Sequence, residues 1–265
     1  MRGVAIRLLY LRSWRKLHQL LTQPRKTLRF VFGTSELDNF TYELSNEGEL
    51  AEFLSLATHV PATALAEYVQ ELGRDHELHE QLRTALGRHD RSGRALVGRR
   101  AGWYALVRAI KPRVVLETGT HAGMGSAVLA RALEKNANDG GQLGHLWTFD
   151  LTSAAGSAIP EFLGGWVTAV EGDLRDSLPR TVATLPGPID LMIHDSDHSY
   201  DHELFEFQTV GPHLAEKGVL LTDNGHATTA LNDYSQVSGR VYSFWRELPK
   251  DHPYPGAGIG LSLSV

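Results

Sequence analysis

The spacing of apolar residues changes near position 110 and divides the chain into two parts of different character. From Arg113 onward, short apolar or β-branched runs alternate with amphipathic stretches, which is the pattern of strands and helices that alternate around a parallel sheet. The apolar runs predict seven strands: Val114–Glu117, Leu146–Asp150, Trp166–Glu171, Ile189–His194, Gly218–Thr222, Val241–Trp245 and Ile259–Val265. Helices are expected to begin near Gly125, Leu174, Asp201 and His226.

The two final strands indicate how the predicted sheet ends. Only the short loop Pro249–Gly258 separates them, and such a loop forms a hairpin but not a crossover. We therefore expect the last strand to run antiparallel to its neighbours. The fold class that this pattern predicts is α/β, with a seven-stranded, mostly parallel sheet and helices on both of its faces.

Residues 1–110 are predicted to form a helical N-terminal extension that precedes a domain of residues 111–265. Its amphipathic stretches predict helices at Glu47–Thr58, Pro61–Leu72, His76–Leu86 and Ala95–Ile110. Its first 30 residues hold eight Arg or Lys and no acid, although the whole chain has a net charge of −5. We expect this basic arm, residues 1–30, to contact a second subunit in a homo-oligomer rather than a nucleic acid.

The composition excludes several classes of protein. With 42% hydrophobic and 22% charged residues, the chain resembles an ordinary globular protein rather than a disordered or fibrous one. The sequence contains no cysteine, which excludes disulfides, thiolate zinc sites and cysteine nucleophiles and agrees with a cytoplasmic location. Apolar spans long enough to cross a bilayer are missing from the sequence, so we expect no transmembrane segment.

Polar side chains concentrate where the fourth predicted strand ends. His194, Asp195, Asp197 and His198 fall within five positions, directly after an apolar run. Carboxylates and imidazoles at the end of a buried strand must find a cation, a proton or water. The cluster therefore predicts a metal site, a general base, or both.

The fifth predicted strand ends in Asp223 and Asn224. Ligands of open α/β sheets bind outside the carboxyl ends of the strands, so these residues are expected to converge there with Asp195. Carboxylate and amide oxygens suit Mg²⁺ or a similar divalent cation better than zinc. The alternative is that the second pair forms only a turn, which residues of these types favour.

The first three strands end in further candidates for ligand binding. The segment Glu117–Gly125 is glycine-rich and leads from a strand into a helix, where glycines let the backbone approach a ligand closely. Asp150 ends the second strand, the place where α/β proteins bind ribose hydroxyls. Asp173 follows the third strand, and the alternative for both acids is a helix cap or a solvated loop end.

Taken together, these motifs resemble the class I S-adenosylmethionine (SAM)-dependent methyltransferases. Within this class, the chain is similar to the metal-dependent small-molecule O-methyltransferases of the macrocin O-methyltransferase-like group. The resemblance spans about Trp103–Val265 and depends on Glu117–Gly123, Asp150, Ile193–Tyr200 and Leu220–Asn224. It implies a Rossmann-like sheet and SAM as the cofactor. One departure is His121, which stands where a glycine is common.

The resemblance also implies roles for individual residues. Asp150 would hold the ribose of SAM and Asp173 would lie by the adenine, while the methionine end would meet the loop residues Glu117, Gly119, Thr120 and Gly123. Asp195, Asp223 and Asn224 correspond to metal ligands, and His198 to the general base of some relatives. The N-terminal extension would cover the cofactor or substrate, with Arg94, Arg99 and Arg100 either in this cover or on a solvated face.

The sequence therefore predicts a SAM-dependent, divalent-metal-assisted O-methyltransferase that acts on a small-molecule hydroxyl of a sugar or phenol. In this mechanism Asp195 and His198 form the catalytic unit. A metal-dependent hydrolase built on His194–His198 is the main alternative. A nicotinamide oxidoreductase is disfavoured by the glycine spacing, and a non-enzymatic nucleotide-binding or assembly protein would depend on the basic arm.

Overall fold

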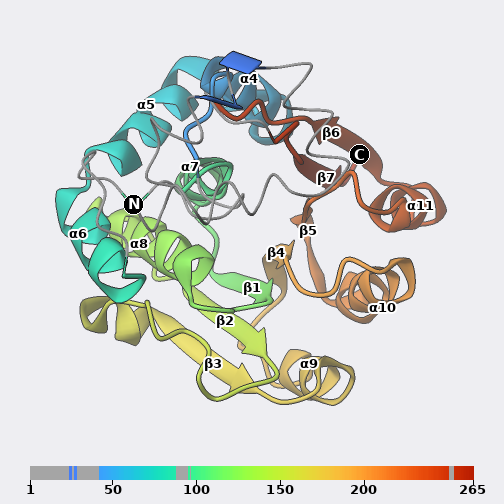
Figure 1. The fold of residues 1–265 in the computed structure, drawn as a ribbon. Coiled ribbons are helices and arrows are strands. Elements are labelled where there is room, and N and C mark those ends of the chain that lie inside the picture. Colours follow the sequence, from blue (N-terminus) through green and yellow to red (C-terminus); the bar gives the residue numbers. More distant parts are fainter. Residues whose placement is uncertain (1–23, 26, 29–41, 88–94, 96, 251–253) are drawn as a thin grey trace.

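A computed structural model describes residues 24–25, 27–28, 42–87, 95, 97–250 and 254–265. Most of the basic arm, and Arg94 with it, lies outside these residues, so the predicted contact with a second subunit stays a prediction. Helices and strands alternate from residue 100 onward (Figure 1). Among the described residues, no helix has the length and hydropathy needed to cross a membrane.

The predicted sheet is confirmed. Its seven strands are β1 (Val114–Thr118), β2 (His145–Asp150), β3 (Val167–Glu171), β4 (Ile189–His194), β5 (Leu214–Asp223), β6 (Val241–Trp245) and β7 (Ile259–Leu263). They lie in the order β3-β2-β1-β4-β5-β7-β6. The last strand, β7, runs antiparallel to both β5 and β6, as the short preceding loop predicted.

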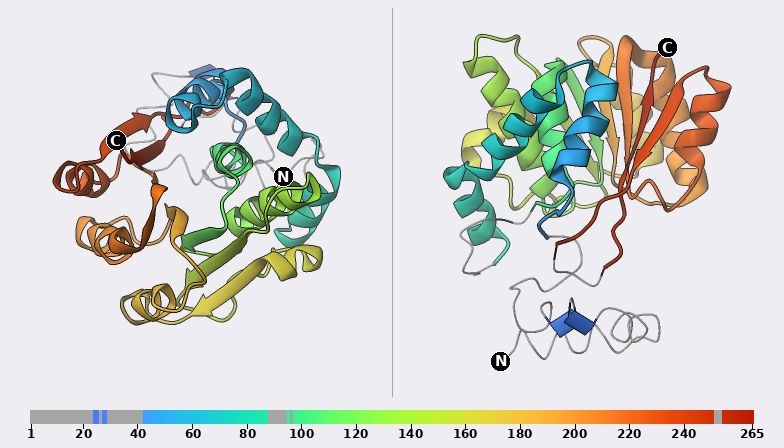
Figure 2. Two further views of the ribbon diagram at one scale, coloured as in Figure 1. Left: turned by 180° about the vertical axis from the view of Figure 1, so that it is seen from behind. Right: turned by 90° about the horizontal axis from the view of Figure 1, so that it is seen from above.

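Helices cover both faces of the sheet because successive strand residues point to opposite sides. Val115 enters the core under α7 (Arg100–Ile110) and α8 (Met124–Asn138). Leu116 enters a separate core under α9 (Leu174–Val182), α10 (Tyr200–Val210) and α11 (Ala230–Val237). The two views in Figure 2 show these helices on either side of the strands.

The N-terminal helices pack onto the α7–α8 side of the sheet. They are α4 (Glu47–Thr58), α5 (Ala62–Gly73) and α6 (His76–Ala85), and Figure 1 shows them as an outer arc beyond α7 and α8. Arg108 of α7 pairs with Glu71 of α5 at 2.9 Å, and Arg131 of α8 pairs with Asp75 at 2.6 Å. The described part of the extension therefore shares its core and its ion pairs with the sheet domain.

Some element boundaries differ from the sequence prediction. Helix α7 begins at Arg100 rather than Ala95, and α11 begins at Ala230 rather than near His226. Strand β5 begins four residues before the predicted Gly218, because its first residues pair with the start of β4 across an irregular step. Two short 3₁₀ helices, Glu161–Trp166 and Gly211–His213, complete the described elements.

Candidate active site

Strand register places the ends of β1, β4 and β5 level with one another. Thr118 is the partner of His194, which is in turn the partner of Thr222. The residues that follow these three are Gly119, Asp195 and Asp223, so the sheet itself brings the glycine loop beside the two acids.

Gly119 is the point at which the loops after β1 and β4 touch. Its φ is +90°, and a Cβ placed on it would lie 2.1 Å from the carbonyl oxygen of Asp195. The backbone N–H of Asp195 donates to the Thr118 carbonyl at 2.9 Å. Only glycine fits here, because any side chain would separate the loop after β1 from the loop that follows β4.

The loop after β1 is tied to the tip of β2. Asp150 Oδ2 accepts a hydrogen bond from the His121 backbone N–H at 2.8 Å. His121 has a φ of 47°, which is the left-handed region that glycine favours. His121 therefore holds a turn conformation that glycine adopts with less strain.

A cavity of about 380 Å³ opens at this end of the sheet. Three of the predicted cofactor residues, Gly119, Asp150 and Asp173, lie in its wall, together with Phe149, Leu151, Gly172, Leu174, Arg175, Ser196, Asp197 and His202. The ends of β1, β2, β3 and β4 therefore all contribute to one hollow, where an α/β sheet binds its ligand.

The other predicted cofactor residues lie behind the cavity wall. Thr120 is buried and its hydroxyl is 2.6 Å from that of Thr148. A Cβ on Gly123 would lie 2.6 Å from Ile159. Both positions shape the loop, and direct contact with a cofactor stays a prediction for them.

Glu117 is also buried, with 1% of its surface exposed. Its carboxylate accepts hydrogen bonds from the hydroxyls of Ser126 and Thr148. Burial raises the pKa of Glu117 to about 7, and these two hydrogen bonds limit the rise. The carboxyl group therefore faces the start of α8, and its predicted contact with the methionine end of SAM stays a prediction.

Asp173 caps α9 as well as lining the cavity. Its Oδ1 accepts from the Arg175 N–H at 2.8 Å, so the helix-cap interpretation is confirmed. Asp197 does not cap α10: its Oδ1 accepts from the Ser199 N–H at 3.0 Å in the turn that precedes this helix.

The two acids of the predicted metal site lie together, and His198 lies beside them. In the described part of the chain, Asp195, His198 and Asp223 offer ligand atoms that all lie within 4.8 Å of one another. Burial and the neighbouring Asp223 carboxylate raise the pKa of Asp195. Two acids and an imidazole at this spacing match the donor set of a divalent cation site.

A guanidinium is already bound to the same acids. Arg99 Nε donates to Asp223 Oδ1 at 2.5 Å, and its Nη2 donates to Asp223 Oδ2. Burial opposes ionisation of Asp223, but Arg99 lowers the pKa of this carboxyl below its usual value. Arg100 Nη2 donates to Asp195 Oδ2 at 3.2 Å. The solvated face considered for these arginines is therefore wrong, since Arg99 is only 3% exposed.

The hydrogen bonds of Asn224 fix the state of His198. Arg99 donates to Asn224 Oδ1 at 3.1 Å, so the amide nitrogen points the other way and lies 2.8 Å from His198 Nε2. An amide N–H can only donate, so His198 Nε2 is an unprotonated acceptor. Burial and the neighbouring His194 lower the pKa of His198, which agrees with a neutral imidazole.

Glu206 of α10 was not among the predicted residues. Its buried carboxylate accepts from Thr118 Oγ1 at 2.7 Å and Ser196 Oγ at 2.5 Å, and lies 2.8 Å from His194 Nδ1. Burial opposes its ionisation, yet His194 lowers the pKa of Glu206 to about 2. Through these contacts Glu206 holds the ends of β1 and β4 together. In the sequence, Glu206 could have been noticed as an acid next to the apolar Phe207 on a helix that faces the core.

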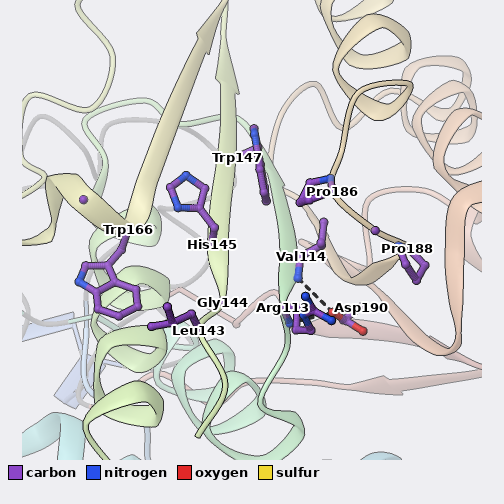
Figure 3. A pocket seen from close by; sticks show the side chains of 12 residues that line it. Arg113, Val114, Leu143, Gly144, His145, Trp147, Trp166, Pro186, Pro188 and Asp190 are labelled. Atoms are coloured by element: carbon purple, nitrogen blue, oxygen red, sulfur yellow. Dashed lines mark hydrogen bonds between the residues drawn. The ribbon is translucent and has the colours of Figure 1, made fainter.

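A larger hollow, of about 560 Å³, lies at the opposite end of the sheet. Figure 3 shows Trp147, Trp166 and Pro186 around it, together with Arg113 and Asp190 at the start of β1 and β4. Because ligands of open α/β sheets bind at the carboxyl ends of the strands, we assign this hollow no part in the chemistry of the acid cluster.

One family model matches the part of the chain that holds the site. Residues 116–225, from β1 to the turn after β5, match the family model described as a methyltransferase domain. The sheet order β3-β2-β1-β4-β5-β7-β6 and the cavity at the carboxyl ends of the strands agree with this similarity. The matched segment contains the glycine loop, Asp150 and both acids of the cluster. None of the curated proteins matches the chain.

Solved structures share the fold over most of the chain. The O-methyltransferase from Bacillus cereus in complex with SAH is 16% identical, with a TM-score of 0.52 over 82% of this chain and 97% of that one. The O-methyltransferase TomG from Streptomyces achromogenes, in complex with SAM, is 19% identical, with a TM-score of 0.51 over 84% and 99%. SAH-bound PaMTH1 from Podospora anserina is 16% identical, with a TM-score of 0.50 over 84% and 97%. The predicted fold class agrees with these matches.

Proposed function

We propose that the chain transfers a methyl group from SAM to a hydroxyl of a small molecule, either a sugar or a phenol of the natural-product type. The observation that carries this proposal is the shared cavity. Asp150, at the tip of β2, lines the same hollow as Ser196 and Asp197, the residues between Asp195 and His198. A cofactor whose ribose binds Asp150 would therefore extend toward the acid cluster.

His198 is proposed as the general base. The acceptor oxygen attacks the methyl carbon of SAM, the carbon–sulfur bond breaks, and the hydroxyl proton passes to His198 Nε2. This nitrogen is unprotonated because Asn224 donates to it at 2.8 Å, and it lies 3.7 Å from Asp195 Oδ1. The acceptor hydroxyl would replace Asn224 as the donor to Nε2. Asp195 would then lie beside the imidazolium that forms and stabilise its charge.

The proposal includes a divalent cation such as Mg²⁺. Asp195, Asp223 and Asn224 would hold it, and the ion would supply Lewis-acid chemistry by lowering the pKa of the acceptor hydroxyl. Support comes from the convergence of the two carboxylates with His198. The homo-oligomer and the cytoplasmic location expected from the sequence remain proposals as well.

The hydrolase alternative gains no support from the described residues. It needs His194 among the metal ligands, but His194 pairs with Glu206 in the buried cluster that joins β1 and β4. Tightly bound zinc in elemental analysis of the purified protein would revive it.

Calorimetric titration with SAM tests the cofactor assignment. Loss of a hydrogen bond to a charged group costs about 1.5–3 kcal/mol, so Asp150→Ala should weaken SAM binding roughly 10- to 100-fold. Glu161→Ala removes an exposed acid outside the cavity and should leave the affinity unchanged. Wild-type protein that fails to bind SAM would refute the proposed function.

Methyl transfer from labelled SAM to a panel of phenols and glycosides tests the base and the metal. His198→Gln should lower turnover about 10²- to 10⁴-fold, the usual contribution of a general base, without loss of SAM affinity. EDTA should remove activity and Mg²⁺ should restore it. If neither the His198→Gln substitution nor EDTA changes turnover, the chain transfers methyl groups by another mechanism.

A further inference from the structure

Arg99 occupies the face of the acid cluster that a divalent cation would need. Its guanidinium donates to both oxygens of Asp223 and to Asn224 Oδ1. Asp223 and Asn224, two of the three residues proposed to hold the metal, therefore already bind the positively charged side chain of Arg99 through their oxygens.

The competition between Arg99 and a divalent cation is clearest at the side-chain amide of Asn224. An amide has one oxygen, and that oxygen accepts from Arg99 at 3.1 Å while the nitrogen faces His198. A divalent cation on the same oxygen would bring two positive charges close together in a buried site, where Coulomb repulsion is little screened. The cation and the guanidinium therefore exclude each other.

Arg99 also has partners that would retain it near the site after such an exchange. Its Nη1 donates to Glu247 Oε1 at 3.0 Å and to Tyr42 Oη at 3.3 Å. Glu247 Oε1 in turn accepts from the Ala257 backbone N–H at 2.8 Å. The guanidinium can leave Asp223 and still be paired with a buried carboxylate.

We propose that Arg99 is a resident competing cation of the acid cluster, and that a divalent ion binds only after this guanidinium has left Asp223 and Asn224. The inference rests on the metal part of the proposed function and names the residue that sets its cation affinity. If the released state is the minor one, with a population of about 1–10%, Arg99 lowers the apparent affinity for the ion roughly 10- to 100-fold.

Binding of Mn²⁺ to the full-length protein, followed by the electron paramagnetic resonance signal of the free ion, tests this proposal without any methyl acceptor. Arg99→Gln should lower the Kd for Mn²⁺ by roughly 10- to 100-fold. Asp223→Asn should abolish binding and so place the ion at this cluster. Arg108→Gln is the matched control, because Arg108 is also a buried arginine, lies in α7, which begins directly after Arg99, and has carboxylate partners, Glu71 and Asp139.

The Mn²⁺ affinities of these variants distinguish the proposal from its alternatives. Equal or weaker Mn²⁺ binding in Arg99→Gln, or an equal gain in Arg108→Gln, would overturn the proposal. If Arg99→Gln does not fold, Arg99→Lys replaces it, since lysine keeps a point charge but loses the planar fork. The lysine variant should bind Mn²⁺ more tightly than the wild type, and unchanged or weaker binding would count against the proposal. Failure of every variant and the wild type to bind Mn²⁺, with SAM binding intact, would instead remove the metal from the proposed function.

Discussion

The buried carboxyl group of Glu117 should make the stability of the fold depend on pH in an unusual direction. Most native carboxylates are stabilised by partners, so acid weakens the fold. Glu117 is the reverse case, because burial raises its pKa from 4.5 to about 7. Between these two pH values the unfolded chain gives up this proton while the native state keeps it, so the free energy of unfolding falls as pH rises. Below pH 4.5 the group has no effect, and above pH 7 its effect is complete.

The magnitude follows from the same two values. A tenfold change in a proton equilibrium corresponds to about 1.4 kcal/mol, so a pKa raised from 4.5 to about 7 costs the native state about 3 kcal/mol at pH 8. Glu117→Gln removes the titrating group and keeps an oxygen that can accept from Ser126 and Thr148. Relative to the wild type, this variant should therefore gain about 3 kcal/mol between pH 4.5 and pH 8.

Urea unfolding of the two proteins at several values between pH 5 and pH 8.5 measures this difference. Ser126→Ala provides the opposite perturbation, because the Ser126 hydroxyl lowers the pKa of Glu117 and its loss extends the fall in stability to higher pH. If the wild type and Glu117→Gln show parallel profiles across this range, the carboxyl group titrates normally and the argument from burial is refuted.

Two further variants test the elements that position the site. Asp173→Ala should destabilise the fold by about 1 kcal/mol through loss of the α9 cap, which urea unfolding measures. Calorimetry with SAM then shows whether Asp173 also contacts the adenine, because loss of the cap alone should leave the SAM affinity unchanged. Glu206→Gln should cost about 3–5 kcal/mol, because it leaves the buried His194 without its charged partner. A loss below 1 kcal/mol in thermal unfolding would show that the Glu206 pair does not hold β1 against β4.

The sheet and the glycine loop were predictable because their signals are local. Six of the seven strands span only five or six residues, and a strand followed by glycines and a helix is recognisable within about ten residues. The reversed last strand followed from a loop length alone. The acids at the ends of β4 and β5 could be brought together from sequence because parallel strands expose their carboxyl ends at one edge.

Arg99 could not be placed in the same way. Its partners Asp223 and Glu247 are 124 and 148 residues away, and no periodicity or motif marks a pairing across such a separation. An arginine at the start of an amphipathic helix is most often solvated, since Arg is rarely fully buried without a partner. The sequence therefore left both a cover over the site and a solvated face open for Arg99, and the structure shows that it is buried against Asp223.

The chemistry of the site is divided between the matched methyltransferase domain and the segments on either side of it. Residues 116–225 supply the glycine loop, the two acids and His198. The positive charges that balance the acids come from outside this range, from Arg99 and Arg100 before β1. Glu247, which follows β6, is a further acid that pairs with Arg99.

These flanking segments are also joined to each other. Ser45 N–H donates to the Leu248 carbonyl at 2.8 Å, and Lys250 N–H donates to the Glu43 carbonyl at 2.7 Å, so the start of the described extension is held against the chain that carries Glu247. A substitution in either segment should therefore change the contacts of Arg99 without changing the glycine loop after β1. If both proposals hold, substitutions in the flanking segments should change the cation affinity through Arg99 while leaving SAM binding unchanged.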